Sequence, residues 1–166
     1  MKKLITTLFL ALFCIAAFAQ NEYINTYKFF KTQNYNNQLR LNTRTGEVLQ
    51  MQSDGQEFVV NYAITPSEES FRYWLYETKN MWTFILLDTF TGKLWQCQFS
   101  VKSTDYIFTI PINEVSLVYG TSPRFSIEPL TSMYQYYLID NETGNMWKFQ
   151  WSTKSDDSYR WIERWR

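Results

Sequence analysis

The chain of 166 residues contains no histidine, only five glycines and four prolines, and two cysteines. Without histidine it lacks the side chain that most often serves as a general base or metal ligand near neutral pH. The glycines stand singly, so a G-x-G-x-x-G phosphate loop is excluded, and no nucleophile motif or metal-ligand spacing is present. The sequence therefore argues against an enzyme and predicts no cofactor and no metal.

Cysteine is scarce in a way that bears on stability. Cys14 lies in the apolar N-terminal segment, and Cys97 is the other cysteine. A chain that keeps only Cys97 after processing cannot form an internal disulfide, so packing must hold it together. Cys97 aligns with Met51 and Phe149 in the repeats described below, which predicts a buried structural residue rather than a reactive thiol. Lipidation at Cys14 is not expected, because Phe13 precedes it where that processing requires a small residue.

The N-terminus has the pattern of a secretory signal peptide. Lys2 and Lys3 precede an apolar run that is too short to span a bilayer and ends in A-F-A at residues 17–19. We expect cleavage after residue 19, which makes residues 1–19 the signal peptide and residues 20–166 a single mature domain without a membrane span. The protein would then be exported, to the periplasm or out of the cell; the alternative is an uncleaved anchor.

The chain also has no large excess of positive or negative charge. Loss of Lys2 and Lys3 with the signal peptide leaves 14 of the 16 basic residues against 16 acidic ones, a net charge of −2. Proteins that bind nucleic acid concentrate positive charge, so nucleic acid is not expected as a partner. Aromatic residues, in contrast, make up 19% of the chain, and few Ala and Leu follow the leader, which favours sheet over helix.

One pattern of residues occurs three times. It reads LNTRTGEVLQMQ at residues 41–52, LDTFTGKLWQCQ at residues 87–98 and IDNETGNMWKFQ at residues 139–150. Repetition at a spacing of about 50 residues indicates a tandem-repeat architecture. An Asn or Asp three residues before Thr-Gly is typical of a type I turn closed by a left-handed glycine. Asn42, Asp88 and Asp140 are therefore predicted to be turn residues rather than a carboxylate pair or a cation site.

Alternation with a period of two predicts strands on both sides of each turn. In the middle unit we expect strands over residues 58–64, 72–76, 82–88 and 93–99, so that each unit has about four. A longer connection in the third unit is expected to include a short helical turn near residues 114–117. Residues 159–166 also alternate, and we expect them to form a closing strand beside the first unit, where they would cover an exposed edge.

The strand before each turn differs between the units on one of its two faces. The residues on that face are Gln38 and Arg40, then Phe84 and Leu86, then Tyr136 and Leu138. We therefore expect the first unit to face solvent on one side and the later two units to be covered on both.

Residues 86–95 and 139–147 resemble the hairpin of pyrroloquinoline-quinone-type propeller repeats, in which a strand ends in Asp and runs through Thr-Gly into a Trp-containing strand. Residues 41–49 match less well, because Leu49 stands where the Trp would be. The whole chain also resembles small exported proteins of Gram-negative bacteria that carry this D-x-x-T-G-x-x-W hairpin. The resemblance implies export and blade-like hairpins, but no cofactor and no catalytic residue.

The expected fold is thus all-β, an antiparallel meander of three tandem repeat units in residues 20–166. Propeller-like and trefoil-like arrangements both remain open at this point. Three units fall short of the four or more blades that close a propeller, unless two chains share one ring.

Aromatic side chains near strand starts and loops are the candidate ligand contacts, because Tyr and Trp offer flat faces to sugar rings and to protein hot spots. The candidates are Trp74, Trp82, Tyr134, Tyr136, Trp161 and Trp165. Arginines flank the last two, where cation–π stacking is expected. For each residue the competing interpretation is packing in the core or at an edge. Gln52, Gln98 and Gln150 recur at one position and form either a polar ligand stripe or an exposed strand face.

Two functions follow from these features. The first is an exported, non-catalytic binding module whose ligand is a glycan or a protein. The alternative is a structural or assembly protein that pairs through exposed sheet edges, which would make homo-oligomers. A glycosidase would need two carboxylates that face each other across a cleft, and the sequence offers no such pair that we would defend.

Overall fold

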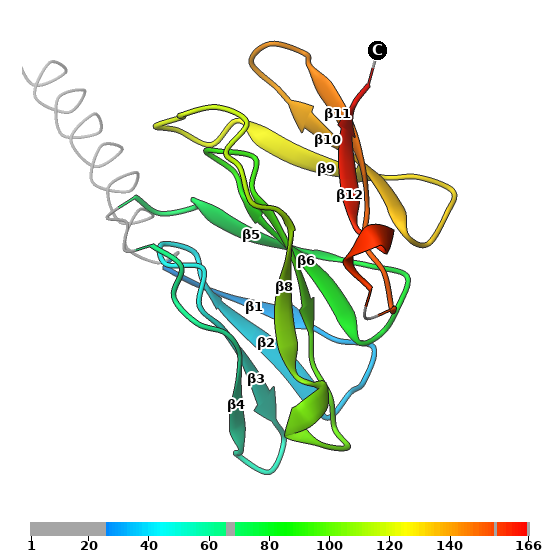
Figure 1. Cartoon of the computed structure of the whole chain (residues 1–166). Coiled ribbons are helices and arrows are strands. Elements are labelled where there is room, and N and C mark those ends of the chain that lie inside the picture. Colours follow the sequence, from blue (N-terminus) through cyan, green and yellow to red (C-terminus); the bar gives the residue numbers. More distant parts are fainter. Residues whose placement is uncertain (1–25, 66–68, 155, 166) are drawn as a thin grey trace, which may run out of the picture.

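The computed structural model describes residues 26–65, 69–154 and 156–165. The predicted signal peptide and its cleavage site lie outside the described residues. The described chain is all-β, with twelve strands in three four-stranded antiparallel sheets (Figure 1). Helix in this part is limited to the 3₁₀ segments η2 (Thr104–Tyr106) and η3 (Asp157–Tyr159).

Each sheet is a meander of consecutive strands, so the strand order follows the chain. The first sheet contains β1 (Tyr27–Lys31), β2 (Asn37–Asn42), β3 (Val48–Gln52) and β4 (Glu57–Asn61). The second contains β5 (Tyr73–Glu77), β6 (Thr83–Asp88), β7 (Leu94–Gln98) and β8 (Phe108–Asn113). The third contains β9 (Phe125–Pro129), β10 (Gln135–Asp140), β11 (Met146–Gln150) and β12 (Trp161–Arg164).

The three repeated turns have the predicted conformation. Gly46, Gly92 and Gly144 have φ of 76°, 74° and 72°, and the N–H of each bonds the carbonyl four residues earlier at 2.8–2.9 Å. Asp88 accepts a hydrogen bond on Oδ1 from the backbone N–H two residues ahead at 3.0 Å, and Asn42 and Asp140 do the same. Because the side chain and the glycine together fix the reversal, the three hairpins share one geometry.

The boundaries of the repeat units differ from the prediction by one strand. The strand expected at 58–64 to open the middle unit is β4, which pairs with β3 and so ends the first sheet. A tight turn explains this pairing, since Gly55 adopts φ 87° and its N–H bonds the carbonyl of Gln52 at 3.0 Å. Such a turn brings β4 back alongside β3, and the second sheet begins with β5.

The C-terminal strand was also predicted in the wrong place. β12 pairs with β11 and completes the third sheet, rather than lying beside the first. The helical turn expected near 114–117 is wrong as well, because these residues form bends without a helix. The misplaced strand has a physical reason: alternation identifies a strand but does not select its partner, and β11 is the nearest open edge for the chain to join.

Two apolar cores separate the sheets. The first core lies between the first and second sheets and includes Leu41 and Leu86. The second core lies between the second and third sheets and includes Leu87 and Leu138. All six residues of β6 are buried, because its two faces enter different cores. Cys97 is buried in the first core, as predicted.

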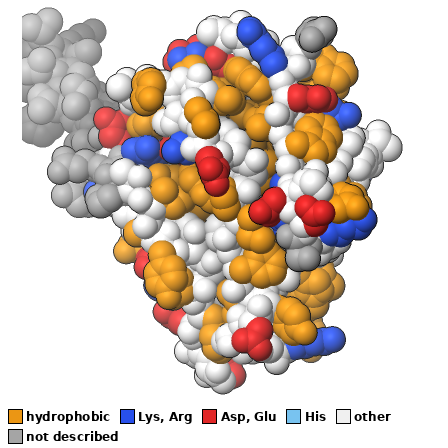
Figure 2. All heavy atoms as spheres, in the orientation of Figure 1, with side chains coloured by type: hydrophobic (Ala, Val, Ile, Leu, Met, Phe, Trp, Pro, Cys, Tyr) orange, Lys and Arg blue, Asp and Glu red, His pale blue; other side chains and the backbone are white. Residues whose placement is uncertain are grey.

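The outer faces of the sheets follow the prediction only in part. The first sheet does face solvent, with Gln38 exposed and Arg40 half-buried. The second sheet is covered on both faces, as expected. The expectation for the third sheet is wrong, because Tyr137 and Ile139 remain half-buried on a face where no further sheet packs among the described residues. On the surface in Figure 2, basic and acidic side chains are interspersed with apolar ones.

Candidate functional site

A turn and a loop meet at one end of the second sheet and form a hollow. In the turn from β5 to β6, the Thr78 hydroxyl bonds the carbonyls of Asn80 and Thr83 at 3.1 and 2.8 Å. The Asn80 side chain accepts a bond from the N–H of Trp82 at 2.9 Å. These bonds hold the backbone of Trp82 immediately before β6, with the indole in the wall of the hollow.

The opposite wall is the loop that leaves β7. The Lys102 N–H bonds the hydroxyl of Ser100 at 3.1 Å, which tightens the loop before η2. Gln98, the last residue of β7, donates from Nε2 to the carbonyl of Tyr106 at 3.2 Å. This bond ties η2 to the sheet and positions the phenol ring at the rim.

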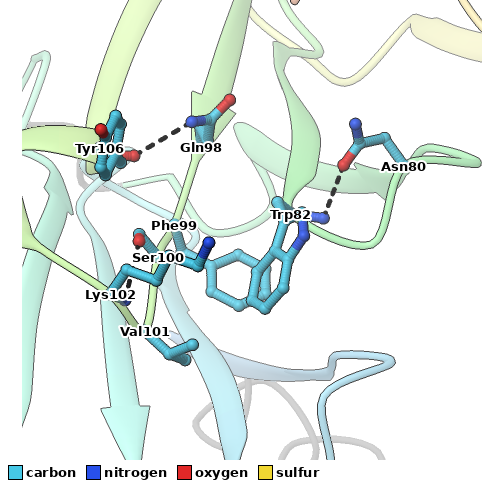
Figure 3. Close-up of a pocket in the computed structure, with 8 residues that line it drawn as sticks. All are labelled: Asn80, Trp82, Gln98, Phe99, Ser100, Val101, Lys102 and Tyr106. Carbon is cyan, nitrogen blue, oxygen red and sulfur yellow. Dashed lines mark hydrogen bonds between the residues drawn. The ribbon is translucent and has the colours of Figure 1, made fainter.

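Together the two walls enclose a cavity of about 350 Å³. Figure 3 shows the lining side chains, with the indole of Trp82 beside Phe99 and the amides of Asn80 and Gln98 on either side. The lining residues are Asn80, Trp82, Gln98, Phe99, Ser100, Val101, Lys102 and Tyr106.

The chemistry of this lining is aromatic and amide. Trp82 and Phe99 pack with ring centroids 5.4 Å apart, and Phe99 is buried in the first core. Tyr106 is 56% exposed, so its ring is free to meet a ligand. Among the described residues that line the cavity, Lys102 is the one charged side chain, and none carries a carboxylate or a thiol. Such a lining can stack on flat apolar faces and exchange hydrogen bonds, but it holds no evident acid–base pair.

Amide side chains continue beyond the cavity toward the first sheet. Val101 also lines a second hollow, of about 270 Å³, with Asn34, Asn36 and Gln52. Gln52 is the equivalent of Gln98 in the first repeat. Two of the three recurrent glutamines, Gln52 and Gln98, therefore line adjoining hollows, and Gln150 lines neither of them.

The third sheet repeats the hydrogen-bond framework of this site. Gln150 donates to the carbonyl of Tyr159 at 3.1 Å, as Gln98 does to Tyr106. There, however, the Lys154 ammonium lies 3.9 Å from the centre of the Tyr159 ring, which folds the lysine over the tyrosine. The second and third units thus differ at equivalent positions.

The six predicted aromatic contacts do not gather at one place. Trp82 lines the cavity. Trp74 packs edge-on against Phe30 of β1 at 5.6 Å, and Tyr134 packs on Trp151 at 5.0 Å. Tyr136 was expected to stay partly open and is instead buried, stacked on Phe149 at 5.6 Å, because its face of β10 turns toward the second core.

Trp161 and Trp165 lie on the third sheet and its C-terminal extension, away from the cavity lining. The cation over Trp161 is Lys148, at 5.7 Å, and Trp165 packs edge-on against Tyr137 at 5.4 Å. Among the described residues, the partners of these two indoles are thus a lysine and a tyrosine from neighbouring strands, and Arg166 lies outside the described residues. Sequence reasoning missed Tyr106 and Asn80; the recurrence of Gln98 was the signal that pointed to their vicinity.

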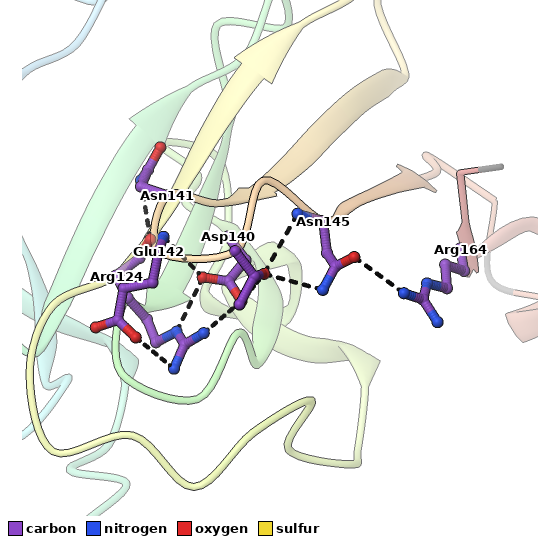
Figure 4. Close-up of polar contacts among 7 residues, drawn as sticks. Arg124, Asp140, Asn141, Glu142, Asn145 and Arg164 are labelled. Carbon is purple, nitrogen blue, oxygen red and sulfur yellow. Dashed lines mark hydrogen bonds and ion pairs between the residues drawn. The ribbon is translucent and has the colours of Figure 1, made fainter.

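The buried carboxylates are structural. Asp88 pairs with Arg72 at 3.0 Å, and Asp140 pairs with Arg124 (Figure 4). Hydrogen bonding from Arg124 lowers the pKa of Asp140 to about 2, and bonds from Thr143 and the Glu142 N–H act in the same direction. Within the described ranges, no three acidic or cysteine side chains gather in a way that could hold a metal ion.

Comparison with known proteins gives no identification: no protein-family model, curated protein or solved structure matches the chain. In the part of the chain that the structure describes, no helix has the length and apolar character needed to cross a membrane.

Proposed function

We propose that the chain is an exported, non-catalytic binding module that holds a saccharide in the cavity beside Trp82. The observation that carries this proposal is the convergence of Trp82 and Tyr106 with the amides of Asn80 and Gln98 on one open hollow. Pyranose rings present an apolar face that stacks on aromatic rings and hydroxyls that bond to amides. The absence of a carboxylate in the lining supports binding rather than hydrolysis.

The size of the site agrees with this proposal. Pockets for small ligands have volumes of about 300–1,000 Å³, and the cavity has about 350 Å³. It lies at an end of the sheet, formed by a turn and a loop, where binding sites concentrate on rigid β frameworks. Its two walls are fixed by the hydrogen bonds of Asn80 and Gln98, so little ordering is needed when a ligand enters.

We further propose that the three sheets are arranged as in a propeller rather than a trefoil. Each unit is a separate four-stranded meander that packs face to face on its neighbour. This is how propeller blades pack, whereas trefoil units share a closed barrel. Export rests on the predicted signal peptide at residues 1–19.

Saccharide binding is tested with a glycan array followed by calorimetry on the best ligand. Tyr106→Ala is expected to weaken affinity about tenfold, since removal of one aromatic contact typically costs about 1–2 kcal/mol. Tyr159→Ala is the matched control, because Tyr159 is the equivalent residue in the third unit and is not among the residues that line the cavity beside Trp82. A second pair, Gln98→Ala and Gln150→Ala, removes the same type of hydrogen bond at the two places. An array without hits, or equal effects within each pair, would refute the proposal.

A further inference from the structure

The stack of three sheets ends in two open faces. On the outer face of the first sheet, Tyr27, Phe29 and Val59 are 48%, 58% and 40% exposed. On the outer face of the third sheet, Tyr137 and Ile139 are half-buried. Neither face packs against another sheet within the described residues. Exposed apolar side chains at both ends of the stack of sheets are typical of interaction surfaces.

The repeat shows what the open face of the third sheet is built to contact. Leu41, Leu87 and Ile139 are equivalent residues of the three units, 46 and 52 positions apart. Leu41 is buried against the second sheet, and Leu87 is buried against the third. Ile139 keeps the same apolar character at the same position, but no following sheet covers it. The third sheet thus presents a face whose equivalents in the other two sheets are internal interfaces.

The turn glycines show the same difference between the third sheet and the other two. A methyl group on Gly46 would lie 3.1 Å from the ring of Tyr73, and one on Gly92 would lie 3.1 Å from the ring of Phe125. Each of these glycines is therefore covered by an aromatic ring from the first strand of the next sheet. A methyl group on Gly144 would meet nothing within 4 Å.

The ring that would cover Gly144 exists at the other end of the stack. Tyr73 and Phe125 are 0% and 4% exposed, and their equivalent in the first sheet is Tyr27, which is 48% exposed. An exposed aromatic ring at one end thus matches an uncovered glycine turn at the other.

A polar link between neighbouring sheets gives independent evidence. Gln50 donates from Nε2 to the carbonyl of Ser100 at 3.0 Å, and its equivalent Gln96 accepts on Oε1 from the N–H of Ser152 at 3.2 Å. Ser100 and Ser152 are themselves equivalent, so one pair of positions joins neighbouring sheets twice, once through the serine carbonyl and once through the serine N–H.

At the two ends of the stack, these linking positions carry opposite charges. The third equivalent of the glutamines is Lys148, on the open face of the third sheet. The first equivalent of the serines is Asp54, exposed in the turn between β3 and β4. Lys148 therefore lies at the end of the stack where no fourth sheet follows in the described chain, and Asp54 lies at the end where no sheet precedes the first. Opposite charges at positions that would face each other favour association and fix its register.

We propose that a second copy of this chain covers both ends, with its first sheet on the third sheet of its partner and the reverse. The contact is head to tail, and two such contacts close a ring of six sheets with two-fold symmetry. Two copies are the number that suits this geometry, because propellers typically contain about 4–8 blades and three copies would give nine. The inference rests on the propeller-like packing and is independent of saccharide binding.

The open face of the first sheet makes this association reversible. It carries Gln38 and Arg40 where the other sheets carry apolar residues. Arg40 already pairs with Glu57 at 3.6 Å and lies 5.6 Å from the ring centre of Tyr27, so its charge is balanced before the faces meet. A face with such polar groups can stay in water as a single chain and still bury its apolar part in a dimer.

The test is the mass of the mature chain by light scattering over a range of concentrations, with charge reversal at the proposed link. The expected result is a concentration-dependent species of twice the chain mass. Lys148→Glu or Asp54→Lys alone should weaken association about tenfold or more, and the double reversal should restore it to within about threefold. Glu114→Lys, an exposed change on the connection after β8, is the control and should leave association unchanged.

A second variant, Phe29→Lys, tests the same interface without changing the turn at Asp54. Because Phe29 is 58% exposed, its replacement should not impair folding of one chain. It should also abolish the double-mass species, while melting curves at low concentration stay unchanged. A single-chain mass at every soluble concentration would overturn the proposal. So would a series of larger species without a dimer, or a dimer that these substitutions do not affect. The mass measurements do not depend on saccharide binding, which is tested separately with Tyr106→Ala.

Discussion

Arg124 and Asp140 form a paired contact across the edge of the third sheet, with Nε 2.9 Å from Oδ1 and Nη2 bonded to Oδ2. The pair closes the base of the third turn (Figure 4). Arg72 and Asp88 form the equivalent pair in the second unit. In the first unit the turn residue is Asn42 and residue 26 is a threonine, so the turn geometry does not require the charge.

This comparison gives a prediction for acid stability. Because the pKa of Asp140 is lowered to about 2 from an ordinary value near 3.8, the carboxylate stabilises the fold fully above the unfolded pKa. That contribution is lost as the pH falls from about 4 toward 2. Asp140→Asn, which retains the turn as Asn42 does, should lower the melting temperature by several degrees at pH 7 and have little effect near pH 2. An equal loss at both pH values would contradict the assignment.

The turn glycines provide a second prediction. Gly92→Ala and Gly144→Ala share the strain of a positive φ, which costs about 1 kcal/mol. The methyl group at Gly92 would also press on Leu117 and Phe125 at 3.1 Å, whereas at Gly144 it meets open space. In urea denaturation at high dilution, Gly92→Ala should therefore lose at least about 1 kcal/mol more than Gly144→Ala. Equal losses would show that neighbouring sheets do not press on these turns.

The thiol of Cys97 should be inert in the folded protein. Burial raises the pKa of this thiol to about 12, and the side chain is 1% exposed. The thiolate is the reactive form, so a thiol reagent at pH 8 should label Cys97 only as fast as the sheets open. Addition of denaturant should raise the labelling rate by several orders of magnitude. Rapid labelling of the native chain would place Cys97 at the surface.

Arg160 is a buried residue that the sequence did not single out. It lies before β12 and is 9% exposed. Its guanidinium bonds Gln96 at 3.1 Å, the carbonyl of Lys154 at 2.8 Å and Asp157 at 3.1 Å. It therefore links the second sheet to the loop after β11.

Replacement of this guanidinium removes three hydrogen bonds, although Gln96 Oε1 keeps the bond from the Ser152 N–H. Arg160→Met should lower the free energy of unfolding by about 2–4 kcal/mol, measured by urea denaturation. Arg164→Met is the control, since Arg164 is exposed and bonds only the side chain of Asn145 in the described contacts. Its loss should stay below about 0.5 kcal/mol. A similar loss at both positions would indicate that the Arg160 network adds no stability.

Local structure could be predicted from the sequence where a residue type strongly favours one conformation or environment. The Asx–Thr–Gly turns follow from glycine's access to positive φ and from a side chain that bonds the backbone two residues ahead. The burial of Cys97 followed from its place in an apolar column.

Partner choice was harder to predict. Alternation in β4 and β12 identified them as strands, but the sheet each joins depends on turn length and on which edge is open. The S-D-G sequence at residues 53–55 was a usable signal for the β3–β4 hairpin. Tyr136 and Tyr137 are adjacent aromatic residues with opposite fates, because only the packing of the third sheet decides which face is covered. The cavity depends on Tyr106, whose position follows from a loop rather than from any periodic pattern.

The most direct test of the binding account is an NMR titration of the labelled chain with the best glycan from the array. The account predicts shifts in the indole N–H of Trp82 and in the side-chain amides of Asn80 and Gln98. The amide of Gln150, the counterpart of Gln98 in the third unit, should not move, and neither should the indole of Trp151, the counterpart of Phe99. Shifts centred on that second group, or no shift at saturating glycan, would contradict it.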